Sequence, residues 1–208
     1  MITEKDVQQA ERNVQNYLSE NLLTKKPEQP SFVPFYISNA KMSLLIAQHL
    51  HNLSIDPSLK KQNNFPSDFE CFLWVVVTSY YSMFYTANAA LAKIGLKVGE
   101  KIAHKITQDC LLAYFIKNNR IAKTMLEEYK EAKNEVLTVM GLNEEELLKE
   151  FKIKANELIA SFDYQRRKRG EFQYDITLSA KQHVAQLSLN RAQKFIQEMN
   201  KIIEKIQK

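Results

Sequence analysis

The sequence predicts an all-α protein, a single-domain antiparallel helical bundle of about seven helices. Two observations carry this prediction. The 208 residues include only 4 glycines and 5 prolines, which are too few turn formers for an architecture of many tight β-hairpins. Apolar side chains recur at steps of three and four residues along most of the chain, as in helices with one buried face. The hydrophobic fraction of 45% and the charged fraction of 25% exclude wholesale disorder.

The predicted helices follow one another with short connections. They cover about residues 3–22, 36–53, 66–95, 100–117, 121–140, 143–170 and 179–208. Thr3 caps the first helix, and Asp6 stands at its third position in a variant of the capping box. Prolines in the linker from Lys25 to Pro34 end this helix. After the second helix, residues 56–64 are predicted to form a polar loop.

The third predicted helix is the centre of the bundle. Pro66 and Ser67 open it, Glu70 completes a Ser-x-x-Glu capping box, and Gly95 closes it. Between these ends the side chains are apolar on nearly every face. Other helices or a partner chain must therefore surround this helix.

Asparagines and glycines separate the remaining helices. Asn118 and Asn119 break the fourth from the fifth, Gly141 ends the fifth, and Asn143 caps the sixth, which ends near Gly170. The last helix carries an apolar stripe made of Ala185, Ser188, Ala192, Phe195, Met199, Ile202 and Ile206. Wide apolar faces on the third and last helices suggest a two-fold partner, so we expect a homodimer.

The cysteines and histidines predict neither a disulfide nor a metal site. Cys71 and Cys110 lie in apolar helical stretches and lack Cys-x-x-Cys spacing. We therefore expect them to be buried as small apolar side chains in a reducing compartment. The four histidines are His49, His51, His104 and His183, and none belongs to a carboxylate–histidine set of the di-iron type. Gly-rich phosphate loops are absent from the sequence as well. We therefore expect no cofactor and no metal.

The sequence also predicts the compartment. Residues 1–15 carry charges where a signal peptide has an apolar core. The most apolar run, Phe72 to Val77, is far too short to span a bilayer. We expect a cytoplasmic protein that does not enter a membrane.

Positive charge is concentrated in the last quarter of the chain. Residues 151–208 hold 12 basic and 6 acidic side chains, whereas the first 150 residues hold 17 basic and 18 acidic ones. A local excess of this kind favours a polyanionic partner, although lysine-rich helix faces in solvent produce the same pattern.

One segment, SFDYQRRKRGEFQYD, combines cations with aromatic rings. It spans Ser161 to Asp175 and contains the cations Arg166, Arg167, Lys168 and Arg169 and the rings of Tyr164, Phe172 and Tyr174. Guanidinium groups bind phosphates through paired donors, and aromatic rings stack on bases. The other interpretation is a basic last turn that stabilises the carbonyl end of the sixth helix. The residues alone leave both open.

Two segments of the sequence resemble parts of one known family. Residues 79–105, SYYSMFYTANAALAKIGLKVGEKIAHK, resemble the core helix and following turn of HEPN domains (higher eukaryotes and prokaryotes nucleotide-binding). The matching positions are Tyr80, Tyr81, Met83, Phe84, Ala87, Leu91, Gly95 and His104. The segment RRKRGEFQYD and the long helix after it are similar to the family's late arginine-rich turn and final helix. The resemblance covers about residues 36–208, so residues 1–24 are an N-terminal helical extension of one domain spanning 1–208.

The resemblance implies an RNA target and a homodimer. Many HEPN domains are metal-independent endoribonucleases, with an Arg, usually a polar residue, and a His four to six positions beyond the Arg. Here Arg169 takes the Arg position, Gly170 replaces the polar residue, and Tyr174 stands where the His would be. A phenol with a usual pKa of about 10 does not shuttle protons near neutral pH as an imidazole does.

We therefore expect an RNA-binding protein without efficient ribonuclease activity. Arg166, Arg167, Lys168 and Arg169 would contact phosphates, with Tyr174 beside them; any remaining catalysis would fall to Arg169 and Tyr174. Two alternatives stay open. One is a toxin–antitoxin-like interaction module with a minimal nucleotidyltransferase as partner protein, which the resemblance implies. The other is a metal-independent endoribonuclease whose base is His104 or His183.

Overall fold

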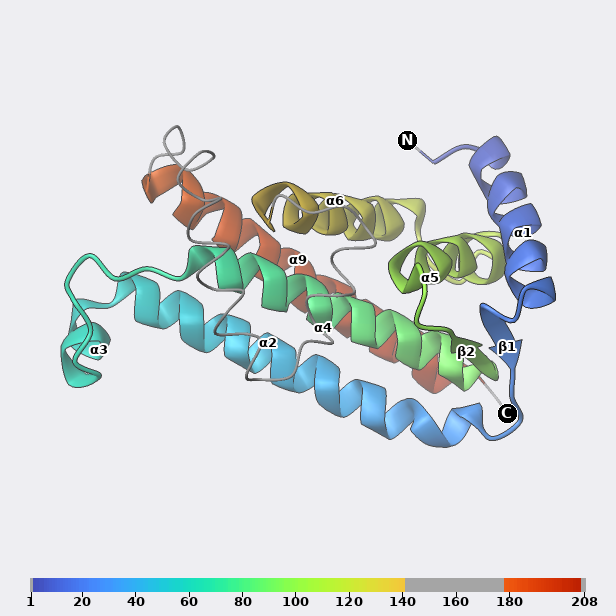
Figure 1. The fold of residues 1–208 in the computed structure, drawn as a ribbon, viewed down its shortest axis with the longest axis horizontal. Coiled ribbons are helices and arrows are strands. Elements are labelled where there is room, and N and C mark those ends of the chain that lie inside the picture. The colour runs from blue at the N-terminus through green and yellow to red at the C-terminus, as the bar shows by residue number, and fades with distance from the viewer. Residues whose placement is uncertain (1, 141–177, 207–208) are drawn as a thin grey trace.

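The computed structural model describes residues 2–140 and 178–206, and helices make up most of them (Figure 1). The helices are α1 (Glu4–Ser19), α2 (Val33–Ile55), α3 (Pro57–Gln62), α4 (Phe72–Lys93), α5 (Ala103–Leu111), α6 (Lys123–Met140) and α9 (Leu178–Lys205). A 3₁₀ turn, Gln29–Phe32, precedes α2, and a π-helical turn, Leu112–Ile116, continues α5. The strands β1 (Leu23–Lys25) and β2 (Leu96–Val98) pair antiparallel. The predicted all-α bundle is confirmed.

Helix α4 lies at the centre of this bundle. Helices α2 and α9 pack along its length, and α6 and α5 cover it from a further side (Figure 1). Helices α2 and α6 run opposite to α4 and α9, and α1 crosses one end, where it packs against α5 and the π-helical turn. The sequence predicts that other helices or a partner chain surround the central helix. Helices of the same chain do so.

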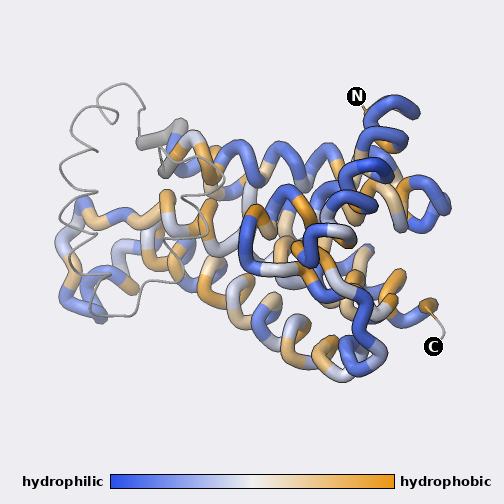
Figure 2. Tube along the Cα trace, turned by 45° about the vertical axis from the view of Figure 1, so that its right-hand side comes forward, coloured by the Kyte–Doolittle hydropathy of each residue, from blue (hydrophilic) through white to orange (hydrophobic). Residues whose placement is uncertain are grey.

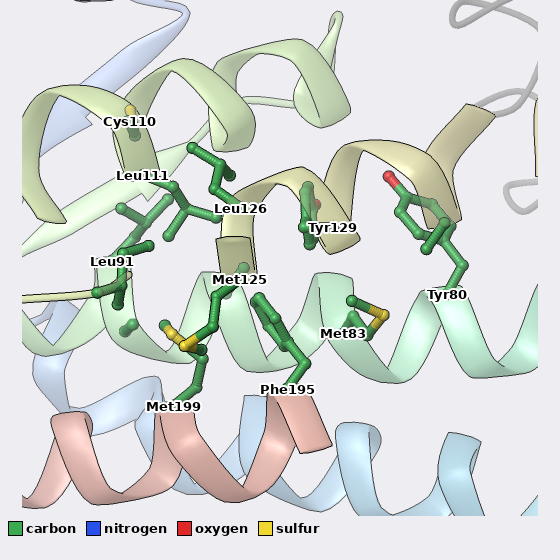
Figure 3. Close-up of a cluster of buried hydrophobic side chains, with 14 of the residues drawn as sticks. Tyr80, Met83, Leu91, Cys110, Leu111, Met125, Leu126, Tyr129, Phe195 and Met199 are labelled. Atoms are coloured by element: carbon green, nitrogen blue, oxygen red, sulfur yellow. The ribbon is translucent and has the colours of Figure 1, made fainter. Parts of the chain in front are cut away.

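The core lies where four helices meet. Figure 3 shows side chains of α4, α5, α6 and α9 pointing toward one another. The largest of those with less than 2% exposure include Tyr80, Met83, Leu111, Tyr129 and Phe195. Full burial of one such side chain stabilises the folded state by about 1.5–3 kcal/mol. The predicted stripe of the last helix is on this side, since Phe195 and the neighbouring turns face the core.

The N-terminal helix is amphipathic and held at both ends. Figure 2 draws most of α1 as hydrophilic, and its buried side is a narrow stripe. Thr3 and Asp6 form the predicted capping box, which is confirmed. Near the other end, Tyr17 Oη donates to Asp109 Oδ2 at 2.9 Å, and Asn13 Nδ2 donates to the same oxygen at 3.0 Å. Because Asp109 is itself buried, this pair of bonds ties α1 to α5.

The start of the central helix differs from the prediction. Helix α4 begins at Phe72, and its N-cap residue Cys71 makes no side-chain capping bond. Glu70 instead accepts a hydrogen bond from Phe72 N at 3.1 Å, and Phe69 N closes a turn onto Pro66 O. The rings of Phe65 and Phe69 stack with centroids 4.1 Å apart. Packing of these rings favours a turn over the predicted first helical turn.

The predicted polar loop at residues 56–64 is wrong, because it contains α3. Asp56 caps this short helix, accepting from Ser58 N at 2.8 Å, and Pro57 occupies its first position. An aspartate followed by proline is a helix-start signal. The Asp56–Pro57 pair therefore predicts a helix, although the polar composition of residues 56–64 suggests a loop.

The small sheet was not predicted. The first helix ends at Ser19 rather than at residue 22, and Leu23 pairs with Val98 across the β1–β2 ladder. Gly95 takes φ +80°, which glycine adopts without strain. A side chain at Gly99 would place its Cβ 2.6 Å from Leu22 O. Two glycines thus allow the chain after α4 to return beside the chain after α1.

Candidate nucleic-acid interface

The residues predicted to bind RNA lie outside the described residues. They are Arg166, Arg167, Lys168, Arg169 and Tyr174. Gly170 and the predicted helix at 143–170 also lie outside the described residues. The structure describes the two helices that precede and follow them in the sequence. Helix α6 ends at Met140, and α9 begins at Leu178, four residues after Tyr174.

Ion pairs fasten these two helices to each other. Arg191 of α9 lies 2.8 Å from Glu135 and 3.1 Å from Glu131 of α6. One turn further along, Lys194 lies 2.8 Å from Glu128. Arg191 is only 15% exposed in its side chain, so its double pairing is worth more than that of a fully solvated pair.

Most positive charge on α9 is already neutralised. In addition to Arg191 and Lys194, Lys181 lies 3.4 Å from Glu70 and Lys201 lies 2.7 Å from Glu198. Among the described residues, Lys205 is the one cation of α9 without a carboxylate within 4 Å. Three of the four paired cations of α9 thus have their glutamate partners outside the C-terminal quarter of the chain, at Glu70, Glu128 and Glu135.

The core-helix motif converges on His104. Tyr80 Oη lies 2.7 Å from His104 Nδ1, and the ring of Phe84 packs on the imidazole with centroids 4.3 Å apart. Tyr81 meets the imidazole edge-on at 5.7 Å. His104 itself has no exposed surface. Four of the eight positions that match the core-helix motif thus form a packed aromatic–histidine cluster (Tyr80, Tyr81, Phe84 and His104).

This environment keeps His104 neutral. Burial, with a smaller contribution from the positive charge of Lys133, lowers the pKa of His104 to about 3. An imidazole with that pKa is a weak base, and one with no exposed surface does not reach a substrate. His104 therefore stabilises the fold, and the geometry argues against the alternative in which it is a catalytic base.

His183 is the other histidine considered as a base. It is exposed and lies in the second turn of α9, nine residues after Tyr174. Among the described residues it makes no side-chain hydrogen bond or ion pair. In the sequence it lies close to the predicted RNA-binding turn, and none of the residues that the structure describes orients it through a hydrogen bond.

Two buried charges escaped the sequence analysis. Lys133 is 6% exposed and donates to Gln108 Oε1 at 3.0 Å. Asp109, also 6% exposed, anchors α1. Both occupy positions on apolar stripes, since Lys133 follows Tyr129 by four residues and Asp109 follows Ile106 by three. A charged residue at a position of an apolar helix face is the sequence feature that indicates such a buried charge.

Both cysteines are free thiols. Cys110 is fully buried, and burial raises the pKa of its thiol well above the usual value. Within residues 2–140 and 178–206, no three His, Cys, Asp or Glu side chains gather as metal ligands would. Over the same residues, no helix is both long and apolar enough to cross a membrane.

The fold is that of an all-α helical bundle, and this fold class alone does not indicate a protein family. Comparison with protein-family models, with curated proteins and with solved structures gives no match to this chain. The function must therefore be argued from its own residues.

Proposed function

We propose that the protein is an RNA-binding homodimer without efficient ribonuclease activity. The observation that carries the proposal is the run Arg166, Arg167, Lys168 and Arg169 with Tyr174 close behind it. Three guanidinium groups provide paired donors for phosphate oxygens, and the phenol ring provides a surface on which a base stacks. The resemblance of residues 79–105 to HEPN domains supports RNA as the polyanion.

The described charges add support by elimination. Four of the five cations in α9 lie within 4 Å of a glutamate, so they compensate charge inside the protein. Such pairing leaves the run Arg166–Arg169 as the densest positive charge of the C-terminal quarter. A polyanion is attracted to charge that is not already compensated.

Incubation with a mixed RNA pool tests binding and cleavage together. The purified protein is mixed with the pool in low salt, with and without a chelator, and the RNA is then examined by filter binding and by gel. We expect retained RNA of unchanged length in both samples. Failure to retain RNA at low salt would overturn the proposal.

Replacing Tyr174 with histidine is expected to produce weak, metal-independent RNA cleavage. The substitution places an imidazole five positions after Arg169, which is the spacing the resemblance implies for a ribonuclease. Imidazole transfers protons near neutral pH, and general acid–base catalysis of this kind contributes about 10²- to 10⁴-fold. Cleavage of a labelled RNA in chelator is the measurement.

Tyr164→His is the matched control, because it adds the same group to the same segment at a different spacing. It should leave RNA intact. Wild-type protein that already cuts RNA in chelator, and loses this activity in Tyr174→Phe, would contradict the non-catalytic interpretation.

The homodimer is proposed on a different surface from the one that the sequence suggested. The outer side of α2 exposes Phe35, Met42, Leu45 and Ile46, with Phe32 just before the helix; we call this the α2 face. Each of these side chains is about half exposed, so together they offer on the order of 500 Å² of apolar surface, near the upper limit for a monomer.

A second copy of the chain fits the α2 face best. Between Val33 and Ile55, Lys41 is the only lysine, arginine, aspartate or glutamate, so each copy brings a single charge to such a contact. Two copies would together bury roughly 1,000 Å² before the neighbouring polar residues are counted, which reaches the lower limit of specific interfaces. A nearly uncharged face offers little to the phosphates of RNA, which supply most of the binding affinity.

A glutamate at Leu45 is expected to convert the dimer to a monomer. In a two-fold contact each copy would bring the new carboxylate into an apolar interface, and an unpaired buried charge is strongly unfavourable. Light scattering at tens of micromolar gives the mass, and Gln193→Glu on the exposed side of α9 is the matched control. Wild-type protein with the mass of one chain would contradict the homodimer and leave the α2 face to a different partner protein, such as a minimal nucleotidyltransferase.

A further inference from the structure

We propose that a second site, a basic groove at the C-terminal end of α9, binds the phosphate of a nucleotide. The groove lies at the end of the bundle where α9 ends beside β2 and the start of α2, far from α3 (Figure 1). Its lining contains no residue of the predicted RNA-binding turn, which precedes the other end of α9 in the sequence. The inference therefore does not depend on the proposed function.

The groove has the size and lining of a small-molecule site. Its larger part has a volume of about 690 Å³ and is lined by Pro27, Glu28, Pro30, Ser31, Lys93, Ile94, Arg120 and Ile206. A smaller part of about 440 Å³ shares Arg120 and Ile206 and adds Ile202 and Lys205. Ligand sites usually measure about 300–1,000 Å³ and combine mostly apolar walls with a few polar groups.

Three cations converge on the groove from distant parts of the chain. Lys93 is the last residue of α4, Arg120 precedes α6, and Lys205 is the last residue of α9. Among the described residues, none of these three side chains forms an ion pair or hydrogen bond, in contrast to the paired cations elsewhere on α9. Like charges brought together without a carboxylate attract an anion.

The acidic residue of the groove does not cancel this charge. Glu28 lies 3.8 Å from Lys26, so its carboxylate is shared with a cation outside the lining. The two lysines have a structural reason to stand where they do, since a cation in the last turn of a helix interacts favourably with its dipole. The start of α6 gives Arg120 no such reason, because a cation before the positive end of a helix is disfavoured.

The backbone around Arg120 is firmly placed. Asn119 adopts φ +52°, and Arg120 N donates to Phe115 O at 2.8 Å, which closes the turn after the buried Phe115. On the opposite wall, Lys26 N donates to Gly95 O at 2.8 Å and holds the chain that leads to Pro27. Both walls are therefore fixed before any ligand arrives, which lowers the cost of binding.

The lining also favours a ligand with an apolar part. Ile94 and Ile206 line the same hollow as the two prolines, Pro27 and Pro30. A planar base would bury its faces against such walls, while its phosphate would lie beside Arg120 and Lys93. A guanidinium binds phosphate through two parallel donors. This combination indicates a nucleotide phosphate, either of a free mononucleotide or at the 5′ end of an RNA.

Titration of ADP into the full chain carrying Arg169→Ala tests the groove apart from the predicted RNA-binding turn. We expect saturable binding by calorimetry, weakened about ten-fold or more by a second substitution, Arg120→Ala. Lys123→Ala is the matched control, because Lys123 is exposed and lies only three residues away, outside the lining. Arg120→Lys keeps the positive charge but loses the paired donors of the guanidinium, so its ADP affinity should lie between those of the Lys123→Ala and Arg120→Ala variants. Circular dichroism verifies that each variant folds.

Three further probes identify the source of the phosphate. Inorganic phosphate should bind more weakly than ADP, and equal affinities would overturn the assignment to a nucleotide. A 5′-phosphorylated tetranucleotide that binds more tightly than its 5′-hydroxyl twin would support the groove and place the phosphate on RNA. No saturation by any probe, or equal ADP affinity with and without Arg120, would overturn the proposal even if RNA binding at the predicted turn is confirmed.

Discussion

Replacing Arg169 with alanine is expected to weaken RNA binding by about ten- to a hundred-fold. The guanidinium of Arg169 is proposed to hold one phosphate through two parallel hydrogen bonds, and a hydrogen bond to a charged group is worth about 1.5–3 kcal/mol. Fluorescence anisotropy with a labelled single-stranded RNA at low salt measures the change. The effect should be nearly independent of RNA sequence, because phosphate contacts position the strand and carry no sequence information.

Lys201→Ala is the control for this change. It removes one positive charge from the same quarter of the chain, but Lys201 is 53% exposed in its side chain and paired with Glu198. Thermal unfolding of the Arg169 variant should remain close to wild type, because a cation near a helix C-terminus contributes only about 0.3–1 kcal/mol. Equal losses of RNA affinity in the two variants would remove the turn from the binding site.

Acidification from pH 8 to pH 5 is expected to lower the free energy of unfolding by about 2 kcal/mol through His104 alone. The pKa of His104 is about 3 in the folded protein, against about 6.5 in an unfolded chain. Between these values the unfolded state binds the extra proton, so stability falls as the pH falls. The contribution is fully present above about pH 6.5 and decreases by about 1.4 kcal/mol per pH unit below it.

His104→Gln should flatten this part of the pH profile, since glutamine does not titrate. His183→Gln, at an exposed position on α9, is the matched control for the loss of an imidazole. Denaturant unfolding at several pH values compares the three proteins. Direct NMR titration of the wild-type imidazoles gives a second readout if His104→Gln folds poorly, and a His104 pKa near 6.5 would contradict the buried cluster.

Most of the fold could be predicted because its helices have one-sided apolar patterns. The stripe that contains Phe195 and Met199 faces the core as its spacing indicates, and both residues are fully buried. The capping box of Thr3 and Asp6 is local in the sequence and was found there. Features of this kind depend on residues a few positions apart, which a pattern along the chain contains.

Features that depend on distant residues could not be predicted in this way. The pairing of Leu23 with Val98 joins segments 75 residues apart, and three-residue strands carry too short an alternation to be recognised. Glu70, the acidic residue of the predicted capping box, lies 3.4 Å from Lys181 of α9 in the structure, and helix α4 starts only at Phe72. The sequence predicts that α4 is surrounded by apolar side chains, but only the structure shows that helices of the same chain provide them and that the α2 face stays exposed.

The functional sites divide in the same manner. The predicted RNA-binding turn is a contiguous motif, so its residues could be named from the sequence, and it stays a prediction because it lies outside the described residues. The basic groove brings Lys93, Arg120 and Lys205 together from three separate elements. Each of these residues is unremarkable in the sequence, and only their convergence without carboxylate partners indicates a site.

The salt dependence of RNA affinity tests the central claim most directly. Anisotropy titrations of the wild-type protein with single-stranded RNA, repeated between low and physiological salt, give the slope of the logarithm of affinity against the logarithm of salt concentration. If the four cations from Arg166 to Arg169 each contact a phosphate, the slope should be about −3, at roughly −0.7 for each contact. An absence of binding at low salt, or an affinity that does not change with salt, would contradict the claim that this protein binds RNA through its basic turn.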